Sequence, residues 1–334
     1  MRTKLPHVSR RDALLLGGAA LMSTPAFAQN TKVQIGVPTR AYWPTIVVEA
    51  ALRQKLFEKE GISAELTVYR GGAEELEGLA AGAADIILIT PFLVSVGRTK
   101  GIGARMIGAG NQDYAGWHMM VSSKSKVTKP EELSGKNVAI TSTGGGADLL
   151  ALFLQQARKI QYTRVSVGGG GLVPSLTSGN VDAVVVPPPL SYNLLKSGEA
   201  RSLVDFSKEI PVHQAGGWTT SEKNIRERPD VIQKALNAIY GGLAWLNANR
   251  DQAIKLIAEI DEIPADIAAV EYENGMTIHA GMNGIRLAPR ERNAQIDSID
   301  LGADRRREAA KAERHVILLR VGCDMLHRSG GAGA

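Results

Sequence analysis

A run of hydroxyl and glycine residues is the sharpest chemical feature of the sequence. Residues 141–146 read TSTGGG and stand between a predicted strand at 137–140 and a predicted helix at 147–158. The first N–H groups of a helix have no partner within the helix and carry about half a positive charge. Glycines let a ligand reach these groups and hydroxyls add donors, so the run predicts contact with a carboxylate, sulfonate or phosphate. The plainer alternative is that Ser142 or Thr143 only caps the helix.

Other predicted strands also end in residues that stack on a ligand or let it approach closely. Ligands of open α/β sheets bind beyond the carboxyl ends of the strands, which makes these loops candidates. Tyr42 and Trp43 could instead cap the fold, and Trp117 and Trp218 could pack at a hinge. The predicted ligand-contacting residues are Tyr42, Trp43, Gly72, Thr90, Phe92, Trp117, Ser142, Thr143, Gly144, Gly145, Pro187 and Trp218.

Catalytic and cofactor patterns find little support. The six histidines include no pair at metal-ligand spacing, and His118 and His279 are interpreted as structural. There is no Gly-x-Ser-x-Gly or Gly-Lys-Ser/Thr motif, and the glycines at 168–171 lack the third glycine of a dinucleotide site. Cys323 is the only cysteine, which excludes an intrachain disulfide and a multi-thiolate metal site. We therefore expect no catalytic residues, no metal, no cofactor and no enzyme activity.

The elements that must position these residues alternate between strand and helix. Strands are predicted at 33–37, 62–69, 85–89, 106–109, 117–122, 137–140, 165–167 and 183–186. Helices are predicted between them at 45–59, 73–81, 147–158 and 172–178, and the chain after Trp218 is predicted to be helical, with helices at 229–246 and 251–260. Gly241 and Gly242 lie inside one helix at a cost of about 1 kcal/mol each, which close contact with another helix would explain. The pattern predicts an α/β protein with two lobes, each built on an open, mostly parallel sheet.

Composition and charge exclude several classes of protein. The chain has 334 residues, 44% of them hydrophobic and 22% charged, which excludes wholesale disorder and collagen-like structures. Of the net charge of +5, residues 1–28 carry +3 and residues 283–334 carry +3, so residues 29–282 carry −1. A nucleic-acid-binding protein needs clustered basic residues on its folded part, so no nucleic-acid partner is expected.

Residues 1–28 have the form of an export signal. A basic segment that contains Arg10 and Arg11 precedes a short apolar run, and Ala26-Phe27-Ala28 is typical of a cleavage site after Ala28. The arginine pair resembles the twin-arginine signal, although an ordinary secretion signal stays open. The predicted location is therefore a bacterial periplasm.

The order of several short motifs resembles the periplasmic substrate-binding proteins of ABC importers. The resemblance is to the group that binds sulfonates such as taurine, nitrate-type anions and thiamine pyrimidine precursors. The residues that carry it are 32–36, 56–62, 71–72, 79–85, 133–139, 176–183 and 228–231. The segments 79–85 and 176–183 are similar to each other, with one in each predicted lobe, and indicate an internal repeat.

This resemblance implies two lobes of the type II-like arrangement that close on a small, anionic organic solute in the cleft between them. Lobe I would comprise 29–115 plus 218–302 and lobe II 116–217. The implied partners are the solute and an ABC permease in the membrane with its ATPase, and the implied state is a monomer. A periplasmic ligand sensor and an enzyme like thiamine-pyrimidine synthase are the alternatives, the second opposed by the export signal and the lone cysteine. The resemblance thins beyond Met282, and we interpret 303–334 as a shifted reading frame or a divergent, partly disordered tail.

Overall fold

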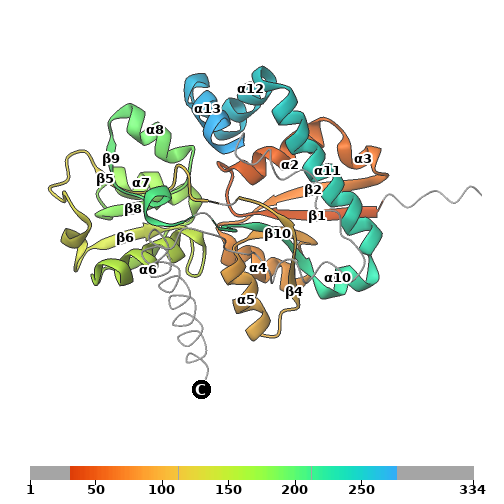
Figure 1. Ribbon diagram of the computed structural model, residues 1–334, viewed down its shortest axis with the longest axis horizontal. Helices are drawn as coiled ribbons and strands as arrows, with labels where there is room; N and C mark the ends of the chain where they lie inside the picture. The colour runs from red at the N-terminus through yellow and green to blue at the C-terminus, as the bar shows by residue number, and fades with distance from the viewer. Residues whose placement is uncertain (1–30, 112, 212, 277–334) are drawn as a thin grey trace, which may run out of the picture.

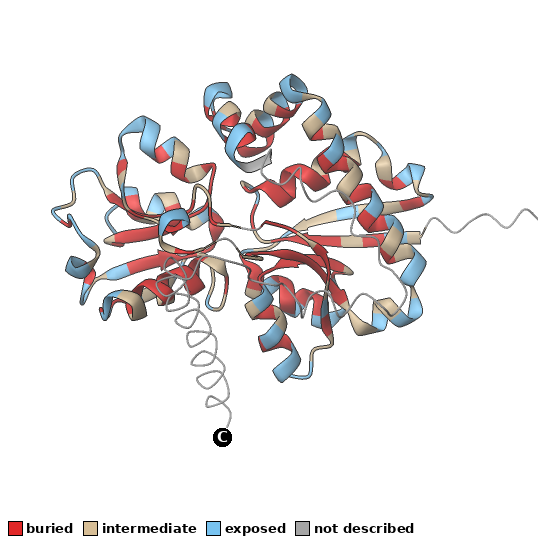
Figure 2. Ribbon diagram, viewed as in Figure 1, coloured by how far each residue is buried: buried red, intermediate tan, exposed pale blue. Residues whose placement is uncertain are grey.

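The computed structural model describes residues 31–111, 113–211 and 213–276. The predicted export signal, Cys323, His279, the tail at 303–334 and the end of the predicted lobe I lie outside the described residues. The elements form two sheets that stand side by side, each with helices packed against it (Figure 1). Buried residues concentrate in the strands of both sheets and in the inner faces of the helices (Figure 2).

The first sheet has five strands in the order β2-β1-β3-β10-β4. β1 is parallel to β2 and to β3, whereas β10 is antiparallel to both of its neighbours. β3 is a run of four buried aliphatic residues because helices cover both of its faces. The strands are β1 Thr31–Val37, β2 Ile62–Val68, β3 Ile86–Ile89, β4 Ala104–Ala109 and β10 Gly217–Ser221. The associated helices are α2 Trp43–Arg53, α3 Leu56–Lys59, α4 Gly72–Ala81, α5 Pro91–Thr99, α10 Glu222–Glu227, α11 Pro229–Ala248, α12 Arg250–Asp261 and α13 Ala265–Glu271, which continues into the π-turn η3 Tyr272–Met276.

The second sheet repeats this plan in the order β7-β6-β8-β5-β9. β6 is parallel to β7 and β8, and β5 is antiparallel to β8 and β9. Its strands are β5 His118–Ser122, β6 Asn137–Ile140, β7 Thr163–Ser166, β8 Ala183–Val186 and β9 Ala200–Asp205. Its helices are η1 Pro130–Leu133, α6 Gly146–Arg158, η2 Gly169–Gly171, α7 Leu172–Thr177, α8 Leu190–Ser197 and α9 Phe206–Glu209.

The predicted fold class is confirmed: both sheets are open, mixed and mostly parallel, and helices accompany each of them. The prediction that the chain is helical after Trp218 is wrong for residues 219–221, because Gly217–Ser221 forms β10, and the helices begin at Glu222. This strand lies between β3 and β4 and its first four residues are buried. A strand covered on both faces has no alternation of polar and apolar residues, so periodicity does not reveal it.

The internal repeat has the same hydrogen-bonding role in both sheets. Asp85 Oδ2 accepts the backbone N–H of Gln34 at 2.9 Å, and Asp182 Oδ2 accepts the backbone N–H of Asn137 at 2.9 Å. Each aspartate therefore ties the start of the β3 or β8 strand to the strand beside it. The two copies of the motif are equivalent in structure as well as in sequence.

The helix predicted at 45–59 is interrupted at Lys55, whose φ of 54° is left-handed, so α2 and α3 are separate. The glycine pair in α11 has the close contact that the sequence led us to expect. A Cβ on Gly242 would lie 2.5 Å from the carbonyl oxygen of Val47 in α2. Glycine at this position therefore lets the two helices approach backbone to backbone.

Two crossover segments join the sheets, and their described residues (110–111 and 113–117 in the first, 210–211 and 213–216 in the second) pair with each other. Gly110 donates its N–H to the carbonyl of Gly216 at 3.0 Å, and Ala215 donates its N–H to the carbonyl of Asn111 at 2.9 Å. A further contact between the two halves joins α13 to α8, where Lys196 forms an ion pair with Asp266. Within the described ranges, no helix combines the length and the apolar character needed to cross a bilayer.

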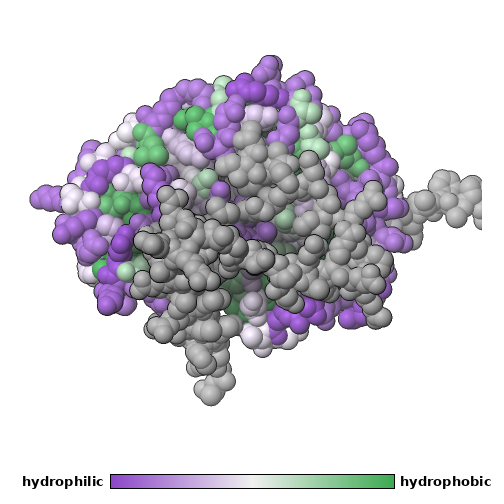
Figure 3. Space-filling view, in the orientation of Figure 1, coloured by the Kyte–Doolittle hydropathy of each residue, from purple (hydrophilic) through white to green (hydrophobic). Residues whose placement is uncertain are grey.

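The described surface is mostly hydrophilic on the face shown in Figure 3, with scattered hydrophobic residues. Val68, Leu195 and Val270 are the large hydrophobic side chains that are well exposed among the described residues. Most of the apolar side chains are therefore in the cores beneath the helices.

Candidate functional site

A cavity of about 60 Å³ lies between the two sheets, next to the crossover segments. A cavity that holds a single water has a volume of roughly 10–15 Å³, so this space suits a small solute or the head group of a larger one. It is lined by Pro38, Thr39, Tyr42, Gly72, Leu88, Ile89, Thr90, Leu93, Asn111, Tyr114, Trp117, Thr141, Gly146, Pro187, Ala215 and Gly216. These described residues include no carboxylate, no basic group and no thiol, so polar recognition falls to hydroxyls, one amide, one indole N–H and the backbone.

Several helices begin at this cavity. Gly72 is the first residue of α4, Gly146 is the first residue of α6, and Tyr42 is the N-cap of α2. Thr90 is the N-cap of α5, and its hydroxyl oxygen accepts the N–H of Leu93 at 3.2 Å. The helices begin here because each follows the carboxyl end of a strand, where a parallel βαβ unit turns back. Proline removes one N–H from the first turn of α2 and of α5, and Thr90 occupies that of Leu93. The partial positive charges of the four helix ends and their remaining N–H groups together favour a negatively charged ligand.

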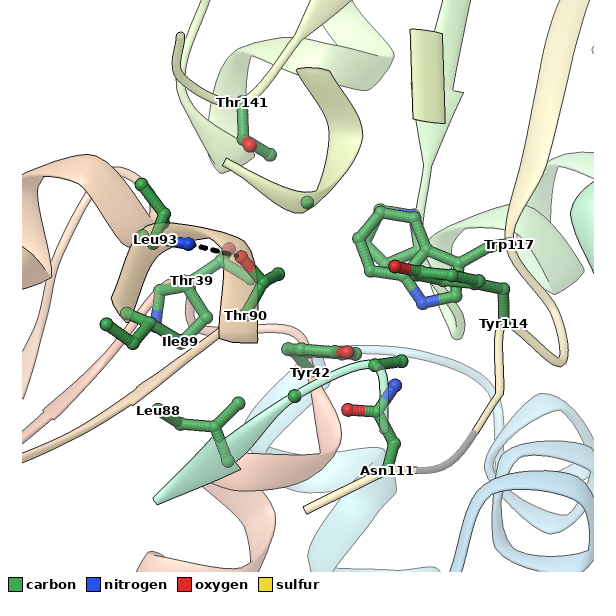
Figure 4. Close-up of a pocket in the computed structure, with 16 residues that line it drawn as sticks. Thr39, Tyr42, Leu88, Ile89, Thr90, Leu93, Asn111, Tyr114, Trp117 and Thr141 are labelled. Carbon is green, nitrogen blue, oxygen red and sulfur yellow. Dashed lines mark hydrogen bonds between the residues drawn. The ribbon is translucent and has the colours of Figure 1, made fainter. Parts of the chain in front are cut away.

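Aromatic rings form the other side of the cavity. The ring of Trp117 makes edge-to-face contacts with Tyr42 at 5.8 Å and with Tyr114 at 6.1 Å between centroids. Figure 4 shows Tyr114 and Trp117 entering from the side opposite Thr90. Burial raises the pKa of both the Tyr42 and the Tyr114 hydroxyl, so both phenols stay neutral and able to donate a hydrogen bond. The Tyr114 hydroxyl is buried and has no hydrogen-bond partner among the described residues.

Glycines let the two halves touch around the cavity. A Cβ on Gly169, which follows β7, would lie 2.3 Å from Thr39 Oγ1, which follows β1. A Cβ on Gly71, which follows β2, would lie 2.4 Å from Ser142 Oγ, which follows β6. The described conformation is therefore one in which the loops of the two sheets meet and narrow the space between them.

Five of the twelve predicted ligand-contacting residues line this cavity: Tyr42, Gly72, Thr90, Trp117 and Pro187. They come from loops after β1, β2, β3 and β8 and from the first crossover segment. Loops far apart in the sequence therefore meet, as the rule for open α/β sheets predicts.

The other seven lie elsewhere. Trp43 and Trp218 are buried and pack edge-to-face at 6.2 Å beside α11, and Phe92 packs against a hydrophobic cluster in the first half. Ser142 faces Gly71 at the contact between the halves.

The remaining three do not line the cavity. Thr143 Oγ1 lies 3.1 Å from Ser166 Oγ. Gly144 donates its N–H to Asp148 at 2.8 Å, and Gly145 donates its N–H to the carbonyl of Ser142 at 3.0 Å. Within the TSTGGG run, the cavity is lined by Thr141 and Gly146 instead.

Residues of both crossover segments were missed by sequence reasoning. Asn111 and Tyr114 come from one segment, and Ala215 and Gly216 come from the other. The segments carry no motif, and only their pairing places them at the cavity. Thr39 and Leu93 also line the cavity. Their places in the sequence, shortly after β1 and in the first turn of α5, could have predicted this.

A second, polar cavity of about 260 Å³ lies on the other side of the 141–146 loop. Thr143 lines it together with Asp148 of α6 and Arg164 of β7, which form a buried ion pair. Desolvation raises the pKa of Asp148, and the charge of Arg164 opposes that rise. In the described ranges, no group of three or more His, Cys, Asp or Glu side chains is placed to hold a metal ion.

His118 is held within the second sheet and does not line either cavity. Its Nδ1 lies 2.8 Å from Ser202 Oγ on the neighbouring strand β9, and burial lowers its pKa. A histidine that is bonded in this way supports the sheet.

This arrangement of two equivalent sheets with a cavity between them is the fold of periplasmic binding proteins. The alkanesulfonate-binding protein SsuA from Xanthomonas axonopodis pv. citri, solved with MOPS bound, has a similar structure, with a TM-score of 0.64 and 19% sequence identity; the similarity covers 74% of this chain and 84% of that one. The periplasmic nitrate-binding protein NrtA from Synechocystis PCC 6803 has a TM-score of 0.60 and 15% identity, over 72% of this chain and 69% of that one.

The family follows from the sequence itself. Residues 46–253 match the model of the NMT1/THI5 like family, and the chain belongs to that family. A Brucella abortus (strain 2308) protein whose name describes it as a binding protein is 22% identical over 280 residues, which cover 80% of this chain and 84% of the relative. The predicted family resemblance is thus confirmed.

Proposed function

We propose that this protein is an extracytoplasmic solute-binding protein that captures a small anionic organic solute and delivers it to an ABC permease. The observation that carries the proposal is the cavity between the sheets, where the N-termini of α2, α4, α5 and α6 converge beside the rings of Tyr42, Tyr114 and Trp117. The helix N-termini bind the anionic group, and the rings contact the apolar body of the ligand. Sulfonates, carboxylates and pyrimidines are the candidate ligands.

Capture uses a hinge between the halves. The paired crossover segments at Gly110 and Gly216 act as the hinge, and the contacts of Thr39 with Gly169 and of Gly71 with Ser142 form when the halves close. Closure excludes water from the cavity, which strengthens the hydrogen bonds to the ligand. The closed form is the one that a permease, with its ATPase, recognises.

The cellular location and the oligomeric state follow from the same proposal. The relatives SsuA and NrtA are described as binding proteins, and NrtA as periplasmic, which supports export of this chain through residues 1–28 and a periplasmic location. The protein acts as a monomer because one chain supplies both halves of the site. The cavity lining, without acid, base or thiol among its described residues, supports binding over catalysis.

A binding screen tests the proposal. Thermal unfolding is measured with ethanesulfonate, taurine, nitrate, benzoate and a hydroxymethylpyrimidine, because a ligand at a hundredfold over its Kd stabilises by about 2.7 kcal/mol. We expect at least one anion to raise the Tm. A response to neutral or cationic solutes alone would show that the anion site is wrong.

Two threonines of the same loop give a matched pair of variants. Thr141→Val removes a hydroxyl that lines the cavity, and Thr143→Val removes one that faces the outer cavity. A lost hydrogen bond of about 1 kcal/mol lowers affinity about fivefold, so Thr141→Val weakens binding by that factor and Thr143→Val does not. Uptake of the identified solute by cells that lack the protein then separates delivery to a permease from sensing.

A further inference from the structure

The first turn of α6 already holds a charge of its own. Asp148 Oδ2 accepts the N–H of Gly144 at 2.8 Å, and Asp148 Oδ1 forms an ion pair with Arg164 Nη1. The Asp148 side chain is 1% exposed and that of Arg164 is 22% exposed. A buried carboxylate therefore lies at the helix end that would attract an anion, and a guanidinium compensates for it.

The pair lies behind the loop and outside the ligand cavity. Thr141 and Gly146 line the inner cavity, whereas Thr143, Asp148 and Arg164 line the outer one. The loop thus lies between the two charged side chains and the inner cavity. Charges inside a protein can influence a ligand that they do not touch, because they are less screened there than in solvent.

We propose that Asp148 and Arg164 together set the affinity of the site for anions by fixing the charge behind the α6 N-terminus. Asp148 alone cancels part of the positive potential of the helix, and Arg164 restores it. Neither residue touches the ligand, so they are specificity-determining residues that act through the helix end. The inference rests on the proposed function, since it assumes that the inner cavity binds the solute.

Charge-changing variants give effects of opposite sign. Asp148→Asn keeps an oxygen that can accept the Gly144 N–H but leaves Arg164 uncompensated, so anions bind more tightly. Arg164→Gln leaves the carboxylate uncompensated, so anions bind more weakly. By Coulomb's law, a unit charge acting over about 10 Å at an effective dielectric constant of about 40 changes the affinity for an anion about fourfold, and this is the size of effect we expect. The double variant restores net neutrality and returns to within about twofold of wild type.

Calorimetric titration with ethanesulfonate, and with its neutral isostere ethyl methyl sulfone, measures this. If ethanesulfonate does not bind, the anion that gave the largest Tm rise in the screen takes its place. Arg164→Gln leaves the buried Asp148 carboxylate without a charge partner and can lower stability. The decisive variants are therefore Asp148→Asn and the double variant. Tighter anion binding by Asp148→Asn, its reversal in the double variant and an unchanged affinity for the sulfone support the proposal.

The failures are distinguishable. If both single variants weaken anion binding, or if the sulfone follows the sulfonate, the pair only holds the loop and the proposal is overturned while the binding function stands. If the wild-type protein binds no anion in the screen, the anion-binding function and this proposal both fall.

Discussion

Replacing Gly169 with alanine tests whether the two halves meet in the ligand-bound protein. The added Cβ would lie 2.3 Å from Thr39 Oγ1 and 2.8 Å from Thr39 Cβ, and both distances are shorter than real Cβ contacts. Rotating the threonine side chain moves Oγ1 but not Cβ. The halves must therefore separate slightly, and only the closed form contains this contact.

The size of the effect follows from this overlap. Overpacking by one methyl group at a tight contact costs about 1–3 kcal/mol. In the proposed mechanism the closed form binds the ligand, so its destabilisation lowers affinity by the same free energy, which corresponds to about 5- to 150-fold in Kd. The effect is the same for any ligand that requires closure.

Calorimetric titration with a ligand from the binding screen measures the Kd of each variant. Gly170→Ala is the matched control, because a Cβ on the adjacent Gly170 has no atom within 4 Å. Thr39→Gly removes both clashing atoms. In the Thr39→Gly background, Gly169→Ala should then cost nothing, which a double-mutant cycle shows directly.

An unchanged Kd for Gly169→Ala would refute the reasoning, because it would mean that 39 and 169 do not meet when ligand is bound. Equal losses for Gly169→Ala and Gly170→Ala would also contradict it. That result would assign the loss to the loop itself.

Three further predictions concern the stability of the fold and the aromatic rings that line the cavity. Gly242→Ala lowers the free energy of unfolding by about 1–3 kcal/mol despite the better helix propensity of alanine, because the added Cβ would lie 2.5 Å from the backbone oxygen of Val47. Gly241→Ala would meet only a methyl group of Leu56 at 3.0 Å. Its free energy of unfolding therefore stays within about 1 kcal/mol of wild type in the same urea titration. Burial raises the pKa of Asp261 from 3.8 to about 7, so the folded protein holds a proton that the unfolded chain has lost between these values. This proton stabilises the folded protein at low pH by up to about 4 kcal/mol, and that contribution is lost as the pH rises from 4 through 7. Burial also raises the pKa of Glu75 and Glu271, so Asp261→Asn removes only the share of Asp261, which is the difference between wild type and variant in urea titrations at pH 5 and pH 8. Trp117→Ala weakens ligand binding by at least about tenfold in the calorimetric titration, because its ring lines the cavity and supports both tyrosines.

Each of these predictions has a contrary result. Equal stability losses for the two glycine variants would mean that α2 and α11 are not in backbone contact at Gly242. The same change in stability between pH 5 and pH 8 for wild type and for Asp261→Asn would mean that Asp261 is ionised in the folded state, against its position beside Glu271 with no hydrogen-bond partner among the described residues. Unchanged binding by Trp117→Ala would place the ligand away from the aromatic rings.

Much of the fold could be predicted from the sequence because local patterns carry it. β1, β3 and α6 have the spacing of their type, and the repeated motif that ends in Asp85 and Asp182 marks the same turn in each half. β10 could not be predicted in this way, because its burial comes from strands more than a hundred residues earlier in the chain.

The candidate site, like the fold, has parts that sequence patterns predict and parts that they do not. Residue patterns alone predict that the candidate binding loops follow strands and that one of them is rich in glycine and hydroxyl groups. Which residues of that loop face the cavity depends on tertiary packing. The backbone turns between β6 and α6, so Thr141 and Gly146 face inward while Thr143 faces the outer cavity with the Asp148 carboxylate. Direction in space depends on how the loop packs against the opposite half, and no local pattern of residue types contains that information.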